Sequence, residues 1–147
     1  MHRDDVPKRL AEAPCPDMGS PAAVAGSELG QRRVALISTA GLMHAGDRPF
    51  GLGSLDYRIL DAEDPRPLQM SHISTNFDRS GFAQDLNVVF PLDLLRELQS
   101  DGTVGSMARY HYSFMGATDP KQLAPAAGDL AAVLAGDRVD LACLIPV

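Results

Sequence analysis

The chain has 147 residues, a length suited to one domain, and its 45% hydrophobic content is typical of a globular protein. Its formal net charge of -6 argues against a nucleic-acid-binding protein, because such proteins need a basic face to neutralise phosphates. The same charge argues against an anionic membrane surface as a partner, and no apolar stretch approaches the ~20 residues that cross a bilayer. The amino terminus carries Asp4 and Asp5 and lacks the apolar core of a signal peptide, so we expect a cytoplasmic protein.

Residues 1–31 differ in composition from the rest of the chain. They contain four prolines, three glycines and no Phe, Tyr or Trp, and they show no sustained hydrophobic periodicity. We interpret them as a mobile or disordered leader and residues 32–147 as one α/β domain.

The first predicted strand of the domain is the continuous apolar run Val34–Ser38. Such a short run is typical of a central parallel strand that is buried on both faces. Thr39-Ala40-Gly41 follows it and could offer backbone N–H groups to an anion, although the segment matches no glycine-rich nucleotide motif. The glycine-rich residues 42–55 predict a loop.

Two further strands are predicted at residues 56–60 and 69–73, followed by a polar stretch at residues 74–87. Arg79 in this stretch could bind a carboxylate through two hydrogen bonds, and Asp78 could orient Arg79 or a histidine. A solvated polar loop is the alternative interpretation.

Two helices are predicted in the second half of the chain. Pro91 suits a first helical position, and Gly102 suits the left-handed residue that ends this helix. Asp119 and Pro120 predict the start of the second helix, which Gly136 ends.

Strands are predicted before and after the second helix, at residues 110–116 and 140–147. The alternation of elements predicts the α/β class, with an open, mostly parallel sheet and flanking helices, apparently truncated after a core strand. In such sheets, ligands bind outside the carboxyl ends of the strands. The last strand reaches that end at Val147, an unusual place for a terminus, unless it simply closes the sheet.

The histidines and cysteines suggest no metal site. His44, His72 and His111 lie at predicted strand ends or in loops and lack short ligand spacing, so hydrogen-bonded histidines are the simpler interpretation. Cys15 and Cys143 are expected to be free thiols, with Cys143 a buried and inert side chain.

Several segments, in this order and spacing, together resemble one known family. The most specific are residues 85–98 (DLNVVFPLDLLREL) and 111–116 (HYSFMG). The supporting segments are residues 34–41, 46–50, 57–58, 71–72, Asp78, Gly102 and Gly105. They resemble selenoprotein B of the glycine/sarcosine/betaine reductase and D-proline reductase family over about residues 33–147.

The resemblance implies an oxidoreductase subunit that cleaves a C–N bond of a small amine or amino acid reductively. In that family a pair such as Pro146-Val147 is followed by selenocysteine-x-x-Cys, whose selenolate attacks the carbon next to the carboxylate. The chain would then be the amino-terminal part of a longer selenoprotein, inactive as written, with its catalytic residues after Val147. No cofactor is expected.

The resemblance also implies partner reductase subunits and a supporting set of substrate contacts, which we expect at His44, His72, Asp78 and His111. The alternative, from another class, is a non-catalytic α/β module that binds a small ligand or a protein. Coding sequence beyond Val147 distinguishes the two.

Overall fold

The computed structural model describes residues 8, 11–12, 19, 24–74 and 79–147. The elements in chain order are η2 (Leu29–Gln31), β1 (Arg33–Ser38), β2 (Leu42–His44), β3 (Arg58–Asp61), β4 (Leu68–Met70), α2 (Ser80–Gln84), η3 (Leu86–Val88), α3 (Leu92–Ser100), β5 (Ser106–Met107), β6 (Tyr110–Ser113), α4 (Ala124–Gly136) and β7 (Leu141–Ile145). The division into a leader and a domain at residue 31 stays a prediction.

Strand β1 bonds to three parallel strands. On one edge its first residues pair with β5 and its last residues with β6, and on the other edge it pairs with β7. β3 extends the sheet antiparallel to β6, while β2 and β4 form a separate antiparallel ribbon. The predicted open, mostly parallel sheet with flanking helices is confirmed.

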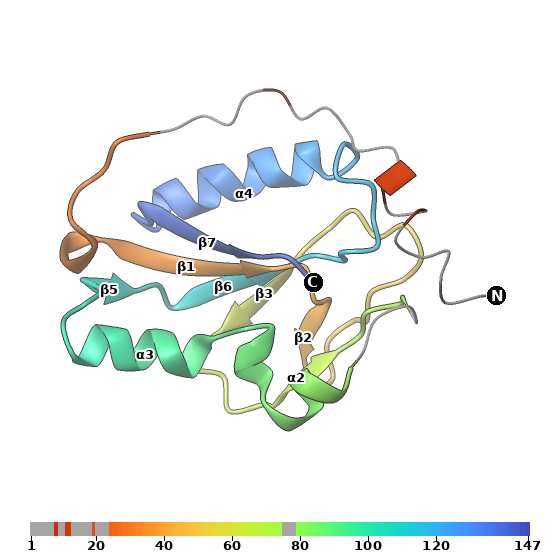
Figure 1. The fold of residues 1–147 in the computed structure, drawn as a ribbon, viewed down its shortest axis with the longest axis horizontal. Coiled ribbons are helices and arrows are strands. Elements are labelled where there is room, and N and C mark those ends of the chain that lie inside the picture. The colour runs from red at the N-terminus through yellow and green to blue at the C-terminus, as the bar shows by residue number, and fades with distance from the viewer. Residues whose placement is uncertain (1–7, 9–10, 13–18, 20–23, 75–78) are drawn as a thin grey trace.

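The sheet lies between two helices, with α3 on one face and α4 on the other (Figure 1). Leu95 of α3 shares a core cluster with Leu36 of β1, and Leu130 of α4 shares the second cluster with Tyr112 of β6. Ile37 of β1 also packs on the α4 side. Because both faces of β1 are covered, its sequence is a continuous apolar run.

Besides the 3-10 helices η2 and η3, three short elements were not predicted from the sequence. β2 lies in the segment expected to be a loop, β5 has two residues, and α2 lies in the polar stretch. Each is too short to show a period, and β2 depends on pairing with β4, which lies about 25 residues further along the chain.

The helix boundaries differ from the predicted ones. Pro91 is the N-cap of α3, and Gly102 has the predicted left-handed conformation, with φ +81°. α4 begins at Ala124 instead of Pro120, because a turn over residues 120–123 comes first and Pro125 occupies the first helical turn, where a missing N–H costs nothing. α4 ends at Gly136 as predicted, and the left-handed residue that follows it is Arg138 (φ +58°).

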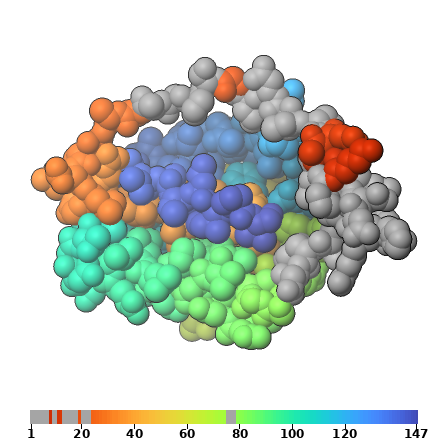
Figure 2. Space-filling view, in the orientation of Figure 1, coloured from red at the N-terminus to blue at the C-terminus, as the bar shows by residue number. Residues whose placement is uncertain are grey.

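Strand β7 lies at an edge of the sheet. Among the described residues it pairs with β1 alone, and Ala142, Cys143 and Leu144 are exposed, the last to 69%. Figure 2 shows β7, in blue, at the surface between the two helical layers. The prediction of a buried Cys143 is wrong, because apolar composition does not reveal whether another strand lies beside this one.

We expect Leu95→Ala to lower the free energy of unfolding by about 2–5 kcal/mol, because Leu95 is 5% exposed and its loss leaves a cavity against β1. Leu94→Ala on the same helix is the matched control. Since Leu94 is 50% exposed, it should cost less than about 1 kcal/mol. Urea denaturation of both variants measures the difference, and equal losses would contradict the assignment of the α3 core face.

Candidate functional site

The chain changes direction across the sheet at β1. From β1 it passes through α3 on one face to β5 and β6, and from β6 it passes through α4 on the opposite face to β7, beyond β1. The carboxyl ends of β1, β6 and β7 therefore meet at a topological switch point, beside the C label in Figure 1. Ligands of open α/β sheets bind at such points, so we place the candidate site there.

The backbone that leaves β1 is fully used by the protein itself. The N–H of Thr39 donates to Ile145 O (3.0 Å), that of Ala40 to Ser38 Oγ (3.1 Å) and that of Gly41 to Phe114 O (2.9 Å). These groups have no hydrogen left for an anion, so the prediction of an anion site at this turn is wrong.

The same turn also fixes the end of β7. Thr39 Oγ1 accepts a hydrogen bond from Val147 N (2.8 Å) and donates to Val147 O (3.3 Å). Gly116 packs tightly here, because a Cβ on it would lie 2.7 Å from Thr39 O and 2.9 Å from Val147 O. Three segments that are distant in sequence are thus held against one another at the carboxyl edge.

His111 has no exposed surface, and its Nδ1 accepts a hydrogen bond from Leu36 N at 2.9 Å. Nδ1 is therefore unprotonated and Nε2 carries the hydrogen, with the ring packed edge-on to Phe90. Burial and the positive charges of Arg96 and Arg33 lower the pKa of His111 to about 4. The neutral ring thus accepts the β1 backbone hydrogen bond that lies between the β5 and β6 pairings.

His44 is also buried, and both of its ring nitrogens are used. Nε2 accepts from Asp61 N (3.1 Å), so Nδ1 carries the hydrogen and lies 3.2 Å from Arg66 O. His44 thereby joins β2 to β3 and to the turn before β4. It lines a cavity of about 170 Å³ together with Phe90, the residue that contacts His111.

His72 lies closer to the switch point. Its backbone contacts the turn after β1, because a Cβ on Gly41 (φ +65°) would lie 3.1 Å from His72 Cα. Its Nδ1 accepts from Ser74 N (3.2 Å), while the Arg79 guanidinium donates to His72 O (2.9 Å). Burial and the Arg79 charge lower the pKa of His72. Asp78 lies outside the described residues.

The structure thus gives the three histidines separate surroundings. Within the described part of the chain, no group of three or more His, Cys, Asp or Glu side chains is arranged to hold a metal ion. Contact of His44, His72, Asp78 and His111 with a substrate stays a prediction.

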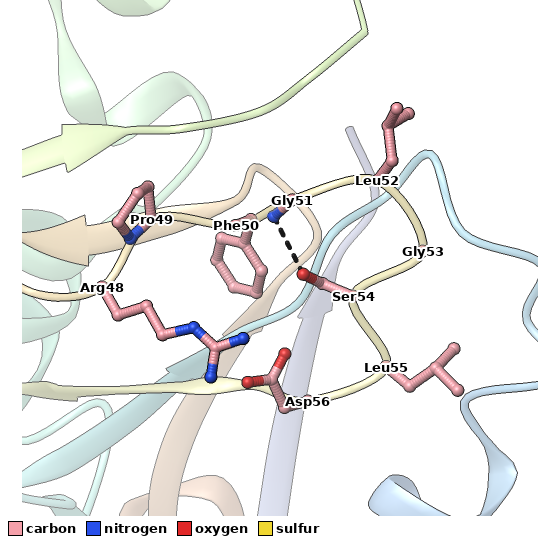
Figure 3. Close-up of a pocket in the computed structure, with 9 residues that line it drawn as sticks. All are labelled: Arg48, Pro49, Phe50, Gly51, Leu52, Gly53, Ser54, Leu55 and Asp56. Carbon is pink, nitrogen blue, oxygen red and sulfur yellow. Dashed lines mark hydrogen bonds between the residues drawn. The ribbon is translucent and has the colours of Figure 1, made fainter.

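A pocket that the sequence reasoning missed is formed by residues 48–56, which we call the loop pocket (Figure 3). It is an open surface hollow of about 670 Å³, and it is attached to the carboxyl edge of the sheet at two points. Phe50 N donates to Ser71 Oγ (2.9 Å), and Thr118 Oγ1 donates to Ser54 O (3.1 Å). The available signal was the charged set Arg48, Asp56 and Arg58 around a glycine-rich turn.

The switch point places the chain in the class of open α/β proteins with a mostly parallel sheet, in which ligands bind outside the carboxyl ends of the strands. Residues 11–146 match the profile of the glycine/sarcosine/betaine reductase selenoprotein B family, so the chain belongs to that family. The match begins inside the predicted leader and confirms the family that the sequence motifs indicated.

Two curated relatives are similar to the chain. One is D-proline reductase subunit gamma of Acetoanaerobium sticklandii, 29% identical over 121 residues, which are 80% of this chain and 49% of the relative. The other is sarcosine reductase complex component B subunit beta of Peptoclostridium acidaminophilum, 26% identical over 95 residues, 60% of this chain and 22% of the relative. The chain thus spans half or less of these relatives. No solved structure matches.

Gly116→Ala should destabilise the protein by about 1–3 kcal/mol, because the new methyl group would collide with the Thr39 and Val147 carbonyls. Gly128→Ala in α4 is the matched control. It meets no atom within 4 Å and should stabilise the helix by roughly 0.5–1 kcal/mol. Thermal unfolding measures both, and a neutral Gly116→Ala would contradict the tight packing of the carboxyl edge.

The low pKa of His111 predicts a loss of stability in acid. Above pH 6.5 the ring is neutral in both states, but between pH 6.5 and about 4 only the unfolded chain takes up the proton. The free energy of unfolding should therefore fall across this window, by roughly 3 kcal/mol in total.

His111→Asn tests this prediction, since the Asn oxygen can accept from Leu36 N without titrating there. Urea denaturation from pH 7 to pH 4 should show the gap between wild type and variant narrowing as the pH falls. Parallel curves would show that His111 does not cause the loss.

Proposed function

We propose that the chain is the amino-terminal part of a selenoprotein B-type reductase subunit, which cleaves a C–N bond of a small amine or amino acid. The observation that carries the proposal is the place of Val147. It is bonded to Thr39 beside the switch point, so residues that follow β7 would enter the region where open α/β sheets bind ligands. The family resemblance implies that the selenocysteine-x-x-Cys pair follows Val147 and lies in this region.

The chemistry is consistent with that position. Reductive cleavage of a C–N bond consumes two electrons and two protons, and it leaves one new hydrogen on the carbon and one on the nitrogen. A selenol and a thiol supply these electrons and protons when they join in a selenium–sulfur bond, by the logic of thiol–disulfide exchange. A selenol ionises more readily than a thiol, and the anion is the nucleophile.

The exposed edge of β7 supports the idea of a longer subunit. Apolar hollows of about 330 and 320 Å³ lie beside the strand, one lined by α4 with Leu144 and the other by α3 with Leu141 and Cys143. A further strand with helices on both sides would cover these surfaces and the free backbone groups of β7. The two relatives are named as subunits, and we propose partner subunits for this chain also.

We propose two roles for the residues expected to contact the substrate. His72 would contact it, because His72 lies against the turn after β1. For Asp78, which lies outside the described residues, contact is proposed from the family resemblance alone. His44 and His111 would support the site, because both ring nitrogens of His44 and Nδ1 of His111 already bond to backbone groups. None of the helices in the described part of the chain has the length and apolar character needed to cross a bilayer, and a cytoplasmic location stays an expectation.

The genomic DNA after the Val147 codon tests the proposal. We expect TGA, then two codons and a cysteine codon in frame, and beyond them a further α/β pattern. Labelling of the cells with selenium-75 should then yield a labelled protein that is longer than 147 residues. A TAA or TAG codon, or TGA followed by no such pattern, would overturn the reductase role and leave the non-catalytic binding module.

A further inference from the structure

Within the described residues, the side chain of Arg48 interacts with Asp56 through its charge but makes no bond to it. It is exposed at the rim of the loop pocket, and it takes part in no hydrogen bond and no ion pair there, although other arginines of the same region do. A guanidinium presents a planar fork of donors that matches a carboxylate. Arg48 is thus available to a ligand.

Asp56 also lines this pocket. Only its Oδ2 is bonded, to Arg58 Nη1 at 2.8 Å, and its side chain is 48% exposed. Partial burial opposes ionisation, but the hydrogen bond and charge of Arg58 hold the pKa of Asp56 below its usual value, and the charge of Arg48 contributes. Figure 3 shows the Arg48 and Asp56 side chains extending toward one another next to the Phe50 ring.

The pocket between them has a fixed frame. Arg58 donates to Arg48 O (2.8 Å) and Pro49 O (3.3 Å), and its guanidinium lies 4.2 Å from the centre of the Phe50 ring. A turn closes the far side, where Ser54 N donates to Gly51 O and Gly51 N donates to Ser54 Oγ. The frame does not depend on the Arg48 side chain, so that side chain is free to bind without unfolding the loop.

We propose that the loop pocket binds a small zwitterion, with Arg48 holding its carboxylate and Asp56 its ammonium group. This inference rests on the proposed function for the relevance of amino-acid ligands, but the opposite charges come from the structure alone. A simple anion would be attracted by Arg48 and repelled by Asp56, and a simple cation would meet the reverse. A molecule with both charges a few bonds apart satisfies both residues.

The experiment is a titration of the full 147-residue chain, labelled with nitrogen-15, with D-proline and with sarcosine. We expect amide shifts concentrated at residues 48–56 and weaker binding of acetate or methylammonium alone. Arg48→Gln and Asp56→Asn should each weaken D-proline binding roughly tenfold to a hundredfold, the range for a lost hydrogen bond to a charged group. Arg48→Lys should retain part of the affinity.

Arg138→Gln is the matched control, because Arg138 is also exposed and its side chain has no partner among the described residues. It should leave the titration unchanged, and circular dichroism confirms that each variant is folded. The inference is overturned if acetate binds as well as D-proline and Asp56→Asn has no effect. It is also overturned if shifts fall elsewhere and survive Arg48→Gln, or if none occur in the millimolar range. The reductase role itself is decided separately, by the codons after Val147.

Discussion

The structure depends on one strand that is bonded along both edges. Backbone groups of β1 that point one way meet the β5–β6 segment, where Val34 O accepts from Ala108 N. Those that point the other way meet β7 and the residue before it, where Arg33 O accepts from Asp140 N. Between β5 and β6 the strand would present an unpaired amide at Leu36, and His111 Nδ1 supplies the missing acceptor. Leaving a buried amide without a partner lowers stability by about as much as the loss of a hydrogen bond, so His111 stabilises the central strand.

This arrangement of β1 decides where chemistry can occur. Because β6 and β7 lie on opposite sides of β1, three strand ends meet at one edge, and the connecting segments are bonded there through Thr39, Ser71 and Thr118. The backbone N–H groups of the turn after β1 already donate hydrogen bonds within this scaffold. The charged groups of the proposed ligand site therefore lie outside this turn, on the loop that carries Arg48 and Asp56.

The buried histidines show why residue type alone is a weak guide to a site. A neutral imidazole offers one donor and one acceptor, so it can pair with two backbone groups where a charged side chain would be costly to bury. His44 does this between Asp61 N and Arg66 O, and His111 uses its acceptor on β1. Arg58 has the equivalent role in the loop pocket, where it donates to the carbonyl groups of Arg48 and Pro49, and the Arg48 side chain makes no hydrogen bond or ion pair among the described residues.

The sequence by itself determined the α/β class, the central apolar strand, the family and the left-handed Gly102, because each follows from local composition or from a contiguous motif. It did not determine β2 or β5, since such short strands are defined only by their partners, nor the exposure of Cys143, since an apolar strand reads alike at an edge and in a core. The tertiary structure alone turned His111 toward Leu36 N, because the two residues lie on segments that meet only after the chain has crossed the sheet. It also decided the shape of the loop that carries Arg48 and Asp56, because that loop is bonded to Ser71 and Thr118, which lie further along the chain.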